Sequence, residues 1–351
     1  MAVASHDSSA LVRFVQRPSF ELVAPLIGFL YLHYAFFSVY AADYLTRASF
    51  ASHHAEGIYR YRVLGKWLVL AVYDAMPDRF RDVLSHQPEY IANRVPQFDM
   101  SVYTTMVAVN FIAFAALVVI GRHLLRSRVP GGYQPLYWML LGWLLLSSAI
   151  VTPYDFLAYF FLVATIAALE WRRSVYAYPA LVVLTVLGAL TRETQALVIP
   201  YAIATLVAAA PGRSRVIVPR ALVVAATFMA TYVALRADLG WRQGLFQNIT
   251  LESNVSALSV FGLVVAALMI TLIHLTAVRC APGAHLRRRL IVLHVAALPY
   301  WATVIFAGFY FELRLFIPLA LIHAAAIVNQ SERRPRESGG MPAFDAVPAV
   351  V

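Results

Sequence analysis

Four short polar clusters interrupt long apolar runs, and their side chains are the ones able to carry acid–base or anion chemistry. Ionisable groups at a membrane boundary are costly, and they usually persist because they serve a function. When the apolar runs are threaded through a bilayer, all four clusters fall on the same side. The clusters are Asp43, the segment 152–155 (Thr-Pro-Tyr-Asp), the segment 191–194 (Thr-Arg-Glu-Thr) and the segment 312–314 (Glu-Leu-Arg).

Asp43 comes directly after the first apolar run and is the first candidate for a general base. A carboxylate that is partly withdrawn from water has a raised pKa, which favours proton abstraction near neutrality. The alternative is an interfacial residue that marks a helix end. Glu56 is the competing base. The His53-His54-Ala-Glu56 sequence could also bind a divalent metal, although adjacent histidines on a loop do not by themselves define a metal site.

The second candidate chemistry is the binding of an anion. Arg192 can hold a phosphate through its planar fork of donors, or it can form a structural pair with Glu193, which can instead cap the next helix. Glu312 and Arg314 are two residues apart, so on a helix they face different ways and each needs a partner elsewhere. Asp155 stands where the helix dipole favours an acid.

Together these residues predict an outer pocket that suits a lipid phosphate or diphosphate leaving group beside a base that activates a hydroxyl. Arg60 and Arg62 add positive charge just above the membrane surface. The predicted catalytic residues are Asp43 and Glu56, and the predicted substrate-binding residues are Arg60, Arg62, Asp155, Arg192, Glu193, Glu312 and Arg314.

The composition predicts an all-α, polytopic membrane protein. The chain is 61% hydrophobic and 13% charged, with a net charge of +10. Its mean hydropathy is +0.70. A soluble domain carries roughly a quarter charged residues. Ten spans fit best, near residues 22–42, 101–120, 136–151, 154–170, 175–190, 195–210, 217–236, 257–278, 290–309 and 313–329. Four of them form two short pairs, each of which could instead be a long broken helix or a re-entrant hairpin.

The basic residues predict the orientation of the chain. With a cytoplasmic N-terminus, the inner segments carry 17 basic and 6 acidic residues, and the outer segments carry 11 basic and 12 acidic ones. This bias follows the positive-inside rule and explains the net charge better than nucleic-acid binding does. The expected location is the plasma (inner) membrane of a bacterium, with both termini in the cytoplasm.

The chain reads as a single membrane domain over residues 1–330, followed by a disordered cytoplasmic tail at 331–351. The first span is expected to remain as an uncleaved anchor. The outer loop 43–100 is the largest extramembrane segment, and residues 57–76 within it predict an amphipathic helix that lies in the interface. The single cysteine, Cys280, excludes an internal disulfide and a multi-cysteine metal site.

The chain resembles the multi-spanning glycosyltransferases of the GT-C superfamily, which use polyprenyl-phosphate-linked sugars. The resemblance rests on Asp43 just past the first span, the long first outer loop and many further spans. The Thr-Arg-Glu segment at 191–193 and the segment 310–318 (YFELRLFIP) are similar to motifs in uncharacterised bacterial proteins of this kind. No soluble C-terminal domain of the kind found in other members is expected, and a lone Asp43 replaces the acidic pair found in several of these families.

The resemblance implies that Asp43 deprotonates a glycan or glycolipid acceptor, which then attacks a polyprenyl-phosphate-linked sugar. It also implies that Arg192, Arg314 and one of Arg60 and Arg62 stabilise the departing phosphate, while the lipid tail lies between spans. Besides membrane lipid, the expected partners are this donor and acceptor, with no nucleic acid. Three alternatives stay open: a lipid-linked-saccharide transporter or flippase, another polyprenyl-carrier transferase or polymerase, and a non-catalytic assembly subunit.

Overall fold

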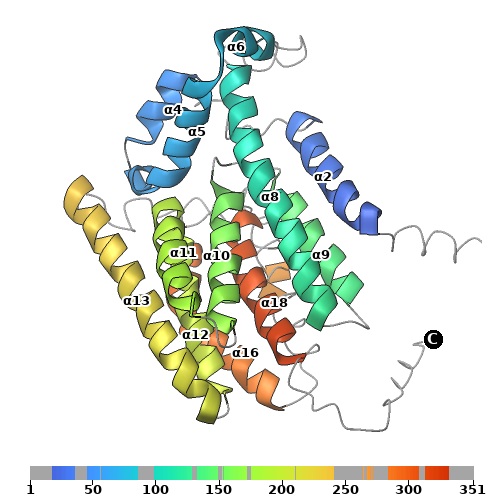
Figure 1. Cartoon of the computed structure of the whole chain (residues 1–351), viewed down its shortest axis with the longest axis vertical. Helices are drawn as coiled ribbons and strands as arrows, with labels where there is room; N and C mark the ends of the chain where they lie inside the picture. The colour runs from blue at the N-terminus through green and yellow to red at the C-terminus, as the bar shows by residue number, and fades with distance from the viewer. Residues whose placement is uncertain are drawn as a thin grey trace, which may run out of the picture.

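Within the residues that the computed structural model describes, every regular element is a helix (Figure 1). The prediction of an all-α protein is therefore confirmed for this part of the chain. The described residues are 18–35, 46–55, 57–85, 99–128, 133–148, 152, 154–171, 175–209, 211–240, 264, 267–268, 270–271, 284–307 and 313–331.

The described helices fall into three groups along the chain. The first group contains α2 (Pro18–Ala35), α4 (Arg47–His53), η1 (Gly57–Tyr61), α5 (Val63–Ala75) and α6 (Asp78–Ser85). The central group contains α8 (Met100–Arg128), α9 (Tyr133–Ser147), α10 (Asp155–Glu170), α11 (Ala177–Thr191), η2 (Glu193–Leu197), α12 (Val198–Val207) and α13 (Pro211–Leu239). The last group contains α16 (Ala284–Ala296), α17 (Leu298–Ala307), η3 (Leu313–Leu315) and α18 (Ile317–Ser331).

Helix α10 is the buried centre of the bundle and packs against α8, α11, α12, α13 and α18. Its 16 residues form an apolar helix with an acid at each end, Asp155 and Glu170. At ~1.5 Å per residue, these acids are separated by about 22 Å along the helix axis. We refer to the two ends of the bundle as the Asp155 end and the Glu170 end.

Contacts at both ends show how the chain runs through the bundle. Arg213 at the start of α13 pairs with Glu170, whereas Gly240, just after α13, accepts a hydrogen bond of 2.5 Å from the Tyr61 hydroxyl near α5. Helix α13 therefore runs antiparallel to α10. The chain also reverses at Arg192, because α11 ends beside Asp155 and α12 returns to place Tyr201 against Glu170.

Helices α4, α5 and α6 lie over the Asp155 end, and α16 lies at the opposite end (Figure 1). The predicted interfacial helix at 57–76 forms as two pieces, η1 and α5, that meet at Arg62. Gly65, Val69 and Tyr73 make up the buried side of α5, while Trp67 is 62% exposed. A Cβ atom on Gly65 would lie 2.6 Å from Tyr154 Cβ, so the glycine permits close packing of α5 on the start of α10.

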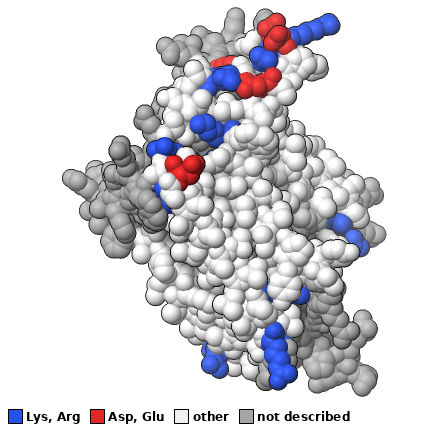
Figure 2. All heavy atoms as spheres, turned by 60° about the vertical axis from the view of Figure 1, so that its left-hand side comes forward, with Lys and Arg blue, Asp and Glu red and all other residues white. Residues whose placement is uncertain are grey.

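Two helical segments within the described ranges are long and apolar enough to cross a membrane, Met100–Ser127 and Arg213–Leu239. Most of the other predicted spans overlap shorter helices, but the span 290–309 is divided between α16 and α17, so ten spans are not confirmed. Most of the span 257–278 and the predicted tail beyond Ser331 lie outside the described residues. Figure 2 shows acidic and basic side chains mixed toward the top of one face, a broad area without charges, and only basic side chains in its lower half.

Candidate functional site

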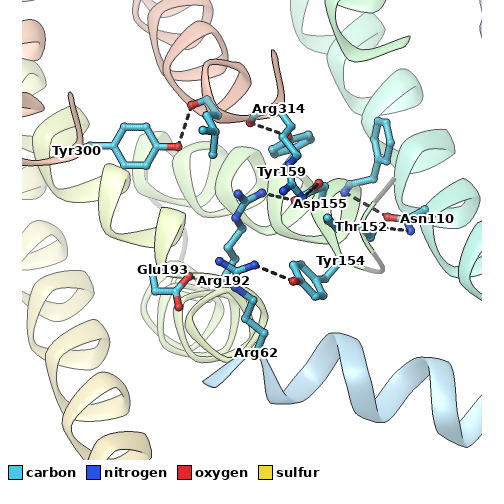
Figure 3. A network of polar contacts seen from close by, with 12 residues as sticks. Arg62, Asn110, Thr152, Tyr154, Asp155, Tyr159, Arg192, Glu193, Tyr300 and Arg314 are labelled. Atoms are coloured by element: carbon cyan, nitrogen blue, oxygen red, sulfur yellow. Dashed lines mark hydrogen bonds and ion pairs between the residues drawn. The ribbon is translucent and has the colours of Figure 1, made fainter. Parts of the chain in front are cut away.

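The site at the Asp155 end begins with the turn that leads into α10. Asn110 of α8 holds this turn: its side-chain amide donates to the Thr152 carbonyl at 3.0 Å, and its Oδ1 accepts from the Phe156 backbone N–H at 3.3 Å. Both groups are buried, and a backbone group that has left water needs such a partner. Asn110 therefore fixes the position of Asp155, the first residue of α10 (Figure 3).

Asp155 is 4% exposed and receives two guanidinium groups from distant segments. Arg192 donates through Nη1 to Asp155 Oδ1, and Arg314 Nη1 lies 3.5 Å from Oδ2. Arg192 occupies the extended residue between α11 and η2, whereas Arg314 lies in η3. Tyr159 of α10 donates to the Arg314 carbonyl at 2.9 Å, which holds the η3 turn against α10 (Figure 3).

Arg62 enters the same region from the N-terminus of α5. Its Nη1 donates to the Tyr154 hydroxyl at 2.7 Å, and its Nε lies 3.4 Å from Glu193 Oε2. The guanidinium also lies 5.0 Å from the ring centroids of both Tyr59 and Tyr154. Burial by itself would lower the pKa of Arg62, but the nearby Tyr154 and Glu193 outweigh burial and raise this pKa above its usual value.

These contacts join five of the predicted site residues, which we call the Asp155 network: Arg62, Asp155, Arg192, Glu193 and Arg314 (Figure 3). Among these residues, three guanidiniums face two carboxylates. The side chain of Glu193 is 28% exposed, and the other four are at most 8% exposed. These five residues therefore carry a net positive charge, and Glu193 is the most accessible of them.

The remaining predicted site residues are placed differently. Arg60 is exposed on η1 and is not part of the Asp155 network. Asp43, Glu56 and Glu312 lie outside the described residues. The expected alternative of a mutual Arg192–Glu193 pair is wrong, because Arg192 pairs with Asp155 and Glu193 with Arg62. Neighbours in sequence point apart here since the extended backbone at Arg192 sends the two side chains to opposite sides.

Sequence reasoning assigned no role to Asn110, Tyr154, Tyr159 or Tyr300. Asn110 was detectable as an isolated amide within an apolar run, where a polar side chain needs a partner. Tyr154 belongs to the polar segment 152–155, but its contact with Arg62 depends on how α5 packs. Tyr300 donates to the Leu315 carbonyl at 2.9 Å and supports η3 from α17, which no local pattern indicates.

A second buried ionic cluster, at the Glu170 end, was also missed. Glu170 pairs with Arg213 and, at 3.3 Å, with Arg289, which is fully buried. Tyr201 donates to Glu170 at 3.0 Å and accepts from Asn329 at 2.5 Å. The charge bias of the sequence counts these residues only as loop charges, whereas the structure buries Glu170 and Arg289 between helices and leaves Arg213 partly exposed.

The metal site considered at 53–56 receives no support from the described residues. His54 is 3% exposed, its Nδ1 donates to the Phe50 carbonyl at 2.9 Å, and His53 packs edge-on against it. No group of three or more His, Cys, Asp or Glu residues within the described ranges is placed to hold a metal ion.

Comparisons with protein-family models, with curated proteins and with solved structures found no match to this chain. The functional argument therefore depends on the residues and their geometry.

Proposed function

We propose that this chain is a membrane-embedded glycosyltransferase that moves a sugar from a polyprenyl-phosphate donor to an extracytoplasmic glycan or glycolipid. One observation carries the proposal: Arg62, Arg192 and Arg314, from three distant segments, converge beside the N-terminus of α10 with only two acids among the described network residues. Guanidinium groups match the geometry of a phosphate, and fixed positive charge stabilises a departing phosphate.

The contacts within the network support Arg62 as the proposed phosphate ligand. Arg192 and Arg314 are both held by the buried Asp155, so their charges already have a partner. The contact between Arg62 and Glu193 is longer, at 3.4 Å, and Glu193 is the most exposed member of the network. An arriving phosphate can therefore replace Glu193 at Arg62 while the Tyr154 hydroxyl keeps the guanidinium in place.

In the proposed reaction, Asp43 takes the proton from the acceptor hydroxyl, with Glu56 as the alternative base. The hydroxyl oxygen then forms a bond to the anomeric carbon of the donor sugar. The bond between that carbon and the phosphate oxygen breaks, and its electron pair leaves with the polyprenyl phosphate. Arg62 stabilises the charge that develops on the phosphate, which lowers the barrier.

The proposed topology has about ten crossings in the plasma (inner) membrane of a bacterium. It places the Asp155 end outside and both chain termini in the cytoplasm. Exposed basic side chains at the Glu170 end support this orientation, because cytoplasmic loops carry an excess of arginine and lysine. Those described are Arg126, Arg215, Arg287 and Arg288.

Donor binding is tested with polyprenyl monophosphate and the full chain in lipid nanodiscs, with native mass spectrometry as the readout. Arg62→Lys keeps the charge but removes the fork, so we expect it to weaken binding by about tenfold or more. The matched control is Arg60→Lys, which changes an exposed arginine two residues away and should bind as the wild type does. Equal binding by the wild type and both variants would remove Arg62 as the phosphate ligand.

The base is tested separately with a polyprenyl-phosphate-linked hexose and a glycolipid acceptor in proteoliposomes. Asp43→Asn should abolish transfer while the thermal unfolding temperature stays close to that of the wild type. Glu56→Gln should retain transfer. The opposite result, with transfer lost only in Glu56→Gln, would assign Glu56 as the base.

The second candidate function is a transporter of lipid-linked saccharides, which the cluster at Glu170 favours. Charged groups at both ends of α10 could contact an anionic headgroup on each side of the membrane. Movement of a fluorescent polyprenyl-phosphate-linked saccharide across proteoliposomes, without transfer of the sugar, would favour this function over the glycosyltransferase.

A further inference from the structure

Two histidines in the interior of the bundle face each other across α16 and α18. Nε2 of His294 and Nε2 of His323 lie 3.1 Å apart, and the centroids of the two rings are separated by 4.4 Å. His294 follows the start of α16 by ten residues, or ~15 Å along the helix. The pair therefore lies between the two charged ends of the bundle, with His323 buried and His294 partly exposed.

The hydrogen bonds of His323 determine where the protons are. His323 Nδ1 lies 2.6 Å from the Leu319 carbonyl, which can only accept, so Nδ1 carries a proton. A neutral His323 then has a bare Nε2. Because the two Nε2 atoms are within hydrogen-bond distance, His294 must carry its proton on Nε2 and donate to His323.

From this geometry we propose that His294 and His323 form a binding site for a single proton between the two charged ends of the bundle. An added proton goes to Nδ1 of His294, whose side chain is partly exposed, and the contact becomes a charge-assisted N–H···N hydrogen bond. A second proton would have to enter at Nε2 of His323. It would break the hydrogen bond and place two cations at a ring separation of 4.4 Å.

Other charged groups on the described elements packed against α16 and α18 lie toward the two ends of the bundle. Those elements also contribute the hydroxyls of Tyr201 on α12 and Tyr300 on α17. The charged groups are Asp155 and Glu170 of α10, Glu193 of η2, Arg287, Arg288 and Arg289 of α16, Arg314 of η3 and the basic residues in the C-terminal part of α8.

Trp301 provides a reporter for this proton. Its ring lies nearly parallel to that of His294, with the centroids 6.3 Å apart and 26° between the planes. A protonated imidazole quenches indole fluorescence much more strongly than a neutral one does. The difference in fluorescence between the full chain and its Trp301→Phe variant therefore follows protonation of the histidine pair.

The first experiment lowers the pH from about 8 to about 5, where imidazoles titrate, with the full chain in nanodiscs. We expect the Trp301 signal to fall in a one-proton transition that is lost in His294→Gln. The matched control is His33→Gln, because His33 also contacts a backbone carbonyl (Phe29, at 2.8 Å) and lies on a different helix. A transition that persists in His294→Gln, or that takes up two protons, would overturn the proposal.

The second experiment needs no variant. Nitrogen-15 NMR of histidine-labelled wild-type protein near neutral pH should show one ring protonated at Nδ1 and bare at Nε2, joined through hydrogen-bond coupling to a ring protonated at Nε2. Absence of this coupling would reject the shared proton. Since neither experiment uses donor or acceptor, their failure is distinct from failure of the proposed transferase.

Discussion

At the residue scale, Asp155 holds the candidate site together. It is buried and contacts both Arg192 and Arg314, so three segments that are distant in sequence depend on one carboxylate. Replacing a buried ion pair as a whole can be nearly neutral, but removing one partner leaves an uncompensated charge. Asp155 is therefore the network residue at which a structural role and a functional role are hardest to separate.

We predict that Asp155→Ala lowers the free energy of unfolding by about 3–5 kcal/mol, because two buried guanidiniums lose their shared acid. Denaturant unfolding in detergent would measure this change. The matched control is Asp74→Ala, which breaks an exposed pair with Arg47 and should have little effect. Equal effects of the two variants would mean that burial does not determine the contribution of Asp155.

A second residue-scale prediction concerns His54, which lies in the loop between α4 and η1. Burial lowers the pKa of His54 to about 4, from a usual value of 6.5. The folded protein therefore holds His54 neutral where the unfolded chain would bind a proton. The contribution of the neutral His54 to the free energy of unfolding is therefore fully present above about pH 6.5. It is lost as the pH falls toward 4, and this loss reaches about 3 kcal/mol.

The measurement is the difference in pH-dependent stability between the wild type and His54→Phe. We expect the variant to lose part of the decline between pH 6.5 and 4, whereas the control His53→Phe, at a more exposed position, should keep it. An unchanged decline in His54→Phe would show that this histidine is not the group responsible.

At the element scale, the packing of α5 on α10 determines whether Arg62 reaches the network. Gly65 is the contact point, because a methyl group there would lie 2.6 Å from Tyr154 Cβ and 3.0 Å from its ring. Tyr154 in turn accepts the hydrogen bond from Arg62. The close packing of Gly65 against Tyr154 therefore helps to determine the position of Arg62, the proposed phosphate ligand.

We predict that Gly65→Ala destabilises the protein by about 1–3 kcal/mol through overpacking and also weakens binding of polyprenyl monophosphate. Gly121→Ala is the matched control, since nothing lies within 4 Å of a Cβ there. That control should be neutral or stabilising by up to ~1 kcal/mol, because alanine is the better helix former. Unfolding and native mass spectrometry would compare the two variants.

At the scale of the whole molecule, two buried ionic clusters occupy opposite ends of a mostly apolar bundle. The Asp155 network lies beneath α4 and α5, while the cluster at Glu170 joins α10, α12, α13, α16 and α18 (Figure 1). Exposed apolar residues such as Ile112, at 70%, lie on the helices between the ends. This distribution suits a protein that crosses a bilayer with its charged groups at the two boundaries.

Topology can be tested with single cysteines at the two ends, in a Cys280→Ser background. We expect a cysteine at Arg79 of α6 to react with an impermeant maleimide from outside intact spheroplasts. A cysteine at Arg287 of α16 should react only after the membrane is opened. Labelling of both from the same side would contradict the proposed arrangement.

The local pattern of residues determined that the described chain is helical and approximately where its helices lie. A run of apolar residues that begins after Asp155 or ends before Arg192 specifies a helix and its limit through short-range effects alone. The same pattern also identified five charged residues that the fold brings together, although their roles in catalysis and binding stay predictions.

Only the tertiary structure decided which charges pair. Arg192 contacts Asp155 rather than its neighbour Glu193, and Arg289 reaches Glu170 across 119 positions of sequence. The physical reason is that a buried charge pairs with whichever opposite charge the packing of helix ends brings within reach. Close contacts between helices, such as Gly65 against Tyr154, determine that packing, and no periodicity along the chain encodes it.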